Sequence, residues 1–147
     1  MWEKGRGKLG VFESLLGTWA ATTRSEQGKV HCTRHFARVL SNRYVRMDTR
    51  WKIGRTTYEE LAIFCVGPDR NLRFWSFTSD GKQSTGEWAD VSDIHPQGFG
   101  FQSRMPGGLA RQIFWPAPDG AMCWAVESKT SKGWKRFVEH RYTQPDD

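Results

Sequence analysis

Apolar and polar residues alternate along most of this chain, and the periodicity of an α-helix is nearly absent. Segments such as 44–51 and 72–77 are rich in β-branched and aromatic residues, which fit the pleated surface of a β-sheet. Turn residues (Gly, Pro, Asp, Asn) recur about every dozen residues and predict nine reversals between about ten strands. These reversals fall at 26–29, 41–43, 52–55, 68–71, 79–82, 95–98, 106–108, 116–120 and 128–133.

One short segment departs from this pattern. Residues Leu9 to Leu16 place their apolar side chains on one helical face, and Gly17 is a helix stop signal. Ten antiparallel strands in so short a chain would expose sheet edges unless the sheet closes. We therefore predict an all-β fold, an antiparallel up-and-down barrel of about ten strands entered by one short N-terminal helix. Such a barrel encloses space for a small ligand.

Length and composition are consistent with one domain. The chain has 147 residues, and we expect a flexible N-terminus over 1–8, a single barrel domain over 9–143 and a C-terminal tail over 144–147. Only 37% of the residues are hydrophobic, but 8 Trp, 9 Phe and 3 Tyr supply large side chains for a core. No apolar run approaches the roughly 18 residues of a membrane span, and the N-terminus lacks a secretory apolar stretch. We expect a cytoplasmic protein, either a monomer or a homodimer.

The net charge and the cysteine content limit the classes of partner and cofactor that the sequence favours. The net charge of +6 favours an anionic partner, but the basic residues are scattered along the chain. Cys32, Cys65 and Cys123 are widely spaced and form no C-x-x-C pair, so we predict reduced thiols and no metal site.

Several segments resemble calycin barrels, the group that contains lipocalins, fatty-acid-binding proteins and nitrobindins. The stretch 12–19 (FESLLGTW) is similar to their short helix and G-x-W start. Together with the turn Gly67-Pro68-Asp69, the hairpin 77–81 and the ending 134–142, it resembles a bacterial family of small calycin-like proteins of unknown function. The resemblance covers about Leu9 to Thr143 and implies a calycin-like barrel that binds a small molecule in its lumen.

Four polar residues on the strands are candidates for the ligand site. Arg46 and Arg50 share one face of their strand, and Tyr58 and Glu60 share one face of the next. The face with Arg46 and Arg50 is either the wet exterior or the lumen. By resemblance to fatty-acid-binding barrels, an internal Arg would pair with a ligand carboxylate through two charge-assisted hydrogen bonds.

The apolar candidates are Trp75, Trp88 and Trp124, which lie on central or late strands. Each is either part of the core or part of an aromatic wall around a flat or apolar ligand. Together with the four polar residues they predict binding of an apolar or anionic organic molecule in the lumen.

His140 lies in the last predicted strand, the region in which nitrobindins, by resemblance, place their heme-ligating histidine. Heme is thus an alternative to a cofactor-free protein. Against heme, Trp19 is followed by Ala20-Ala21-Thr22 and not by the further glycines of nitrobindins. His140 otherwise orients the ligand.

No hydrolase, P-loop, dinucleotide or H-E-x-x-H motif occurs in the sequence. A cofactor-free isomerase or cyclase acting in the same lumen is an alternative, because positioned Arg, Glu, Tyr and Trp side chains can stabilise a developing charge. Nucleic acid is disfavoured: arginines and aromatics are interleaved on the strands, but the chain has no basic run and no RNA-binding motif.

Overall fold

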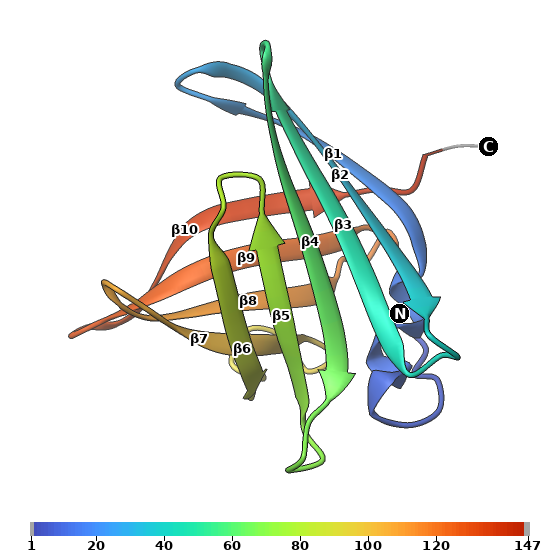
Figure 1. Ribbon diagram of the computed structural model, residues 1–147. Helices are drawn as coiled ribbons and strands as arrows, with labels where there is room; N and C mark the ends of the chain where they lie inside the picture. The colour runs from blue at the N-terminus through green and yellow to red at the C-terminus, as the bar shows by residue number, and fades with distance from the viewer. Residues whose placement is uncertain (1, 146–147) are drawn as a thin grey trace.

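The computed structural model describes residues 2–145, and its ten strands form one antiparallel sheet that curls into a nearly closed barrel. Each strand pairs with the strand that follows it in the chain, so the sheet order runs from β1 to β10 (Figure 1). The predicted all-β up-and-down barrel and its short N-terminal helix are confirmed. The elements are η1 (Lys8–Leu15, a 3₁₀ helix), β1 (Gly17–Ser25), β2 (Gly28–Val39), β3 (Tyr44–Ile53), β4 (Thr56–Val66), β5 (Leu72–Thr78), β6 (Gln83–Ala89), β7 (Phe99–Met105), β8 (Gly108–Pro116), β9 (Met122–Thr130) and β10 (Gly133–Tyr142).

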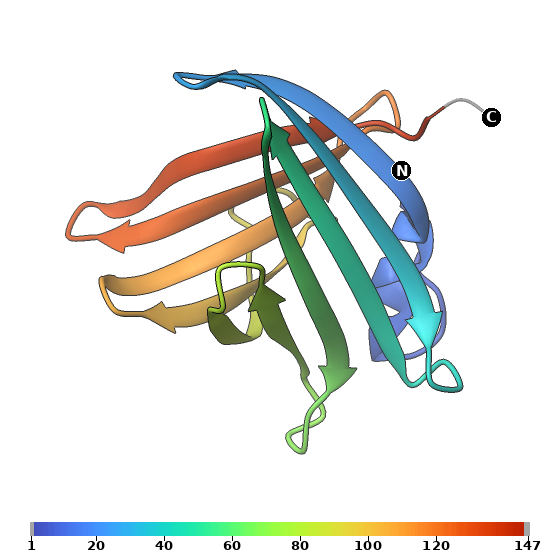
Figure 2. The same ribbon diagram turned by 45° about the horizontal axis from the view of Figure 1, so that its top comes forward.

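The first and last strands meet at one end of the barrel. The backbone N–H of Ala20 donates to the carbonyl of Thr143 at 2.8 Å, and the N–H of Thr143 donates back at 2.9 Å. Beyond this bridge β1 and β10 diverge (Figures 1 and 2). We call the end with η1 the closed end. The opposite end, ringed by the hairpin turns β1–β2, β3–β4, β5–β6, β7–β8 and β9–β10, is the mouth.

Strand β2 shows the alternation that orients the side chains. Val30, Cys32 and Phe36 are buried inside the barrel, whereas His31 and His35 are exposed on its outer face. The inner face of β2 is therefore apolar except for Arg34.

Phenylalanine side chains fill the closed end. Phe12 of η1 is fully buried, and its ring centroid lies 4.6 Å from that of Phe64 and 5.1 Å from that of Phe99. The indole N–H of Trp19 donates to the carbonyl of Leu15 at 2.7 Å and ties η1 to β1. The interior of this end is therefore packed, and the large cavity of the barrel lies toward the mouth.

The segment before η1 lies against the barrel. The ring of Trp2 lies 6.0 Å from that of Phe99, and the N–H of Glu3 donates to the hydroxyl of Ser14 at 2.8 Å. Residue 1 of the predicted N-terminal segment 1–8 and residues 146–147 of the predicted tail 144–147 lie outside the described residues. Among residues 2–145, no helix has the length and apolar character needed to cross a membrane.

Candidate functional site

The mouth half of the barrel holds a cavity of about 690 Å³, a size typical of small-molecule sites. Its walls are mainly apolar and come from every strand from β2 to β10. The large wall side chains are Trp51, Tyr58, Phe74, Trp124 and Val126. A hollow of this size with aromatic walls can hold the body of an apolar organic molecule.

Arg34 on β2 is the exception on that strand's inner face. Its side chain lines the cavity although only 1% of it is exposed. Nε donates to the hydroxyl of Tyr142 at 2.9 Å, and Nη1 donates to Sδ of Met47 at 3.2 Å and to Oγ1 of Thr49 at 3.3 Å. Its guanidinium carbon lies 4.0 Å from the centroid of the Trp124 ring. All of these partners are electrically neutral.

The second buried arginine has very different surroundings. Arg111 on β8 also borders the cavity, but its Nε donates to Oε1 of Glu127 at 2.8 Å and its Nη2 donates to Oδ2 of Asp93 at 2.8 Å. Within residues 2–145, no carboxylate lies within 4.0 Å of Arg34. Burial of a charge is costly unless a counter-charge compensates it. The cavity thus has one cation that the described protein does not neutralise.

Two polar residues of β10, Tyr142 and His140, lie next to Arg34. Because the Tyr142 hydroxyl accepts from Arg34, its own proton is available to Nδ1 of His140 at 3.2 Å. Burial, and secondly the positive charge of Arg34, lower the pKa of His140 to about 4, so this imidazole is neutral at pH 7. Burial likewise raises the pKa of Tyr142 to about 12. A neutral histidine and a neutral tyrosine keep the surroundings of Arg34 free of negative charge.

A carboxylate faces the same cavity from β4. In the sheet register Arg34 pairs with Thr49 of β3, and Thr49 pairs with Glu60 of β4. Arg34 and Glu60 are therefore two strands apart, with about 10 Å between their Cα atoms, which is too far for direct backbone neighbours. Glu60 accepts a hydrogen bond from the hydroxyl of Ser76 at 2.5 Å. The site has a cation on one wall and a hydrogen-bonded carboxylate on the next.

Three of the predicted site residues line the cavity: Tyr58, Glu60 and Trp124. The structure corrects the expectation for the two arginines. Arg46 and Arg50 are exposed on the outer face of β3, and Arg46 forms an ion pair with Asp48 at 2.9 Å. That face is the wet exterior because its alternate residues fill the barrel.

The remaining predicted residues, like the two arginines, are not part of the cavity lining; they are Trp75, Trp88 and His140. Trp75 is on the outer face of β5 and 48% exposed, and Trp88 stacks on Phe99 near the N-terminal segment. His140 is buried, with its ring centroid 5.1 Å from that of Trp51 and 5.3 Å from that of Trp124. The Nδ1 atom of His140 lies 3.2 Å from the Tyr142 hydroxyl, and heme ligation by this histidine stays a prediction.

Sequence reasoning missed Arg34. Its signal was present in the alternation of β2, where Arg34 occupies the position expected of an apolar residue between Cys32 and Phe36. An isolated charge on an otherwise apolar strand face indicates a functional charge better than a face on which several charges gather.

Among the described residues, no three His, Cys, Asp or Glu side chains are arranged to hold a metal ion. Comparison of the sequence with protein-family models and with curated proteins finds no match. The barrel is compatible with a calycin-like fold, and the resemblance to a particular bacterial family stays a prediction.

Proposed function

We propose that this protein binds a small organic molecule with an apolar body and an acidic group in the mouth half of the barrel. Arg34 receives the acidic group, and the aromatic wall with Trp51 and Trp124 contacts the apolar body. The observation that carries the proposal is a buried arginine that lines a cavity and has no carboxylate partner among residues 2–145.

The geometry around Arg34 supports an anion in particular. Nε and Nη1 are held by Tyr142, Thr49 and Met47, and Nη2 takes part in none of these bonds. The Trp124 ring covers one face of the guanidinium, so a ligand approaches along its edge, the direction in which hydrogen bonds form. A charge-assisted bond to a carboxylate contributes about 1.5–3 kcal/mol, or about 10- to 100-fold in affinity.

The test compares two ligands that differ only in their polar end. Decanoic acid and decanol are titrated into the protein at pH 7, with the quenching of tryptophan fluorescence as the signal. The proposal predicts that the acid binds at least about tenfold more tightly than the alcohol. Equal affinities, or tighter binding of the alcohol, contradict the acidic-group assignment.

Two neighbouring residues of β6 provide a control for the location of binding. Ser84 lines the cavity, whereas Thr85 is exposed on the outer face beside Trp75. Ser84→Trp should fill the cavity and abolish binding of both ligands, and Thr85→Trp should leave both affinities unchanged. Equal binding by the two variants would place the ligand outside the lumen.

A second candidate function, proton transfer on the bound ligand, is favoured by Glu60. This carboxylate faces the cavity and can act as a base while the Arg34 cation stabilises negative charge on the ligand. In D₂O such an enzyme would exchange the protons next to the ligand's carbonyl or carboxyl group, and Glu60→Gln would stop the exchange. Absence of catalysed exchange in the NMR spectra of a panel of oxo acids would favour simple binding.

A further inference from the structure

The barrel gathers the chain's positive charge at its mouth. We count each of the five mouth turns together with two flanking residues on either side, namely 24–29, 52–57, 77–84, 104–109 and 129–134. These segments contain 8 basic and 2 acidic residues, a net charge of +6. All eight are exposed: Arg24, Lys29, Lys52, Arg55, Lys82, Arg104, Lys129 and Lys132.

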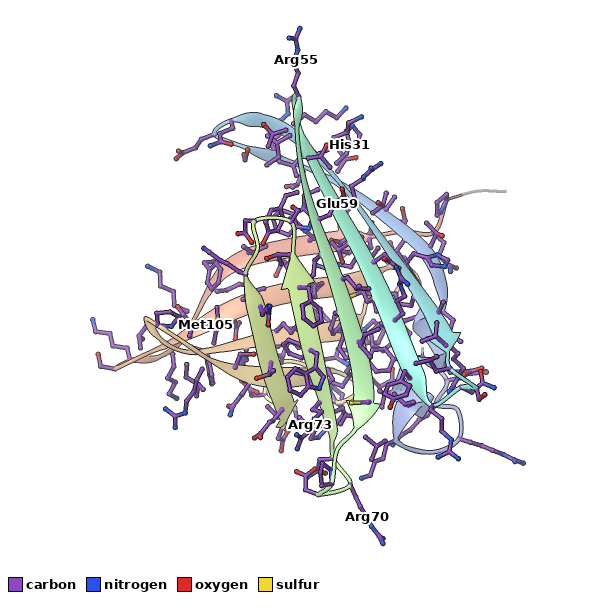
Figure 3. The ribbon with its side chains drawn as sticks, in the orientation of Figure 1. His31, Arg55, Glu59, Arg70, Arg73 and Met105 are labelled. Atoms are coloured by element: carbon purple, nitrogen blue, oxygen red, sulfur yellow. The ribbon has the colours of Figure 1, made fainter. Side chains whose placement is uncertain are left out.

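By the same count, the closed end has equal numbers of basic and acidic residues. Its four turns with their flanks, 38–45, 65–73, 88–100 and 115–123, contain 4 basic and 4 acidic residues, a net charge of zero. The segment from Trp2 to Leu15 adds 3 basic and 2 acidic residues there. Residues that are scattered in the sequence therefore form a strongly polarised molecule. Figure 3 shows Arg55 and Arg70 pointing away from opposite ends of the barrel.

The mouth charges also lack partners. Among residues 2–145, only one of the eight basic side chains has a carboxylate within 4.0 Å, namely Lys82, which lies 3.9 Å from Asp80. At the closed end, by contrast, Arg38 pairs with Glu13 and Arg73 pairs with Asp69. The closed end is thus neutral overall and partly paired, whereas the mouth keeps a net positive charge that is available to an external anion.

Apolar side chains project among these charges. Met105 is 47% exposed and Phe137 is 60% exposed, and both also line the cavity. The register of β10 shifts between Arg136 and Val138, and Phe137 is the extra residue of this bulge. Bulges commonly redirect a side chain, and here the ring faces solvent at the opening.

We propose that the mouth docks on an anionic lipid surface, with its basic ring over the headgroups and Met105 and Phe137 inserted between them. Exposed apolar side chains surrounded by Lys and Arg are the combination that binds anionic interfaces. The charges lie on five separate turns around an opening and do not follow a groove, which matches a plane of headgroups better than a nucleic acid strand. The docking holds whether or not the lumen takes an acidic ligand, and it gives an apolar ligand a direct route between bilayer and cavity.

The test measures co-sedimentation of the full chain with vesicles. One set is pure phosphatidylcholine, and the other contains about 30% phosphatidylglycerol. We expect at least about tenfold tighter binding to the anionic vesicles, with most of the binding lost between about 0.05 M and about 0.5 M salt. Equal binding to both sets, or binding to neither, overturns the proposal.

Paired variants test which end docks. Arg55→Gln with Lys132→Gln should weaken binding to the anionic vesicles about 25-fold, since each surface charge contributes about fivefold. The matched control is Arg43→Gln with Arg70→Asn at the closed end, where asparagine tolerates the positive φ of 67° at residue 70; it should change binding less than about twofold. Equal losses in the two pairs overturn the assignment to the mouth. Thermal melting verifies that all four substitutions leave the barrel intact.

Two further results bear on the nature of the surface. Phe137→Ser should weaken binding about fivefold without changing its salt dependence, and no loss would overturn the insertion of this ring. Tighter binding to a single-stranded oligonucleotide than to the anionic vesicles would overturn the lipid surface in favour of a nucleic acid.

Discussion

The central guanidinium carbon of Arg34 lies 4.0 Å from the centroid of the Trp124 ring, and both residues line the same cavity. The ring face and the neutral oxygen and sulfur acceptors stabilise the buried cation without cancelling its charge. The protein can therefore keep Arg34 folded inside the barrel and still present a positive site to a ligand.

The first prediction is that Arg34 and Trp124 are energetically coupled. Arg34→Met and Trp124→Leu each remove one partner, and a double-mutant cycle isolates the pair. We expect a coupling free energy of about 1–2 kcal/mol in urea denaturation, because this cation–π contact is desolvated. Additive effects of the two substitutions would contradict the contact.

The second prediction concerns pH and His140. The pKa of His140 is about 4 in the folded protein and near 6.5 in the unfolded chain, so between these values the unfolded state binds the extra proton. The free energy of unfolding should fall by about 3 kcal/mol as the pH drops from about 6.5 to about 4, and His140 should contribute no further change below that. Urea denaturation at pH 7, 5.5 and 4 measures this loss.

Other groups also titrate in this range, so the comparison needs variants. His140→Gln should show a smaller loss of unfolding free energy between pH 7 and pH 4 than the wild type. His31→Gln, on the exposed face of β2, should follow the wild-type profile. An unchanged profile in His140→Gln would contradict the burial of a neutral imidazole.

The third prediction is that the Tyr142 hydroxyl positions Arg34. Tyr142→Phe removes the acceptor of Nε and the neighbour of His140 Nδ1, and both polar groups stay buried. We expect a loss of about 1–3 kcal/mol in the free energy of unfolding. The affinity for decanoic acid should fall while that for decanol stays the same, and a parallel fall of both would indicate a purely structural role.

The fourth prediction concerns the space beside the cavity. A Cβ on Gly86 would overlap the ring of Phe74 and would lie 2.8 Å from the hydroxyl oxygen of Ser103, and both of these residues line the cavity. Gly86→Ala should therefore destabilise the barrel by about 1–3 kcal/mol and weaken ligand binding. Gly107→Ala is the control, because its Cβ would meet nothing within 4 Å. Equal melting temperatures for the two variants would contradict the close packing at Gly86.

The fold was predictable because its determinants are local. The alternation of apolar and polar residues and the turn residues at nine reversals specify ten consecutive antiparallel strands. These local signals are sufficient to predict the barrel from the sequence. Tyr58 and Glu60 were also predicted to lie on one face of their strand, and they do.

The candidate site was only partly predictable, because alternation alone does not say which face is internal. Strand β5 carries Leu72 and Phe74 inside and Trp75 outside, so both faces contain aromatic residues and the pattern could not separate them. Arg34 and Trp124 are 90 positions apart in the sequence and meet only because the barrel closes. The positive mouth has the same origin, since it combines five turns that are distant in sequence.

The most direct test of the account is the preference for an acid over an alcohol in two arginine variants. Arg34→Met removes the internal cation, and Arg50→Met removes an exposed arginine from the outer face of the adjacent strand. The account predicts that Arg34→Met binds decanoic acid and decanol with similar affinities, whereas Arg50→Met keeps a preference for the acid of at least about tenfold. A preserved acid preference in Arg34→Met, or its loss in Arg50→Met, would contradict the assignment of Arg34 as the anion site.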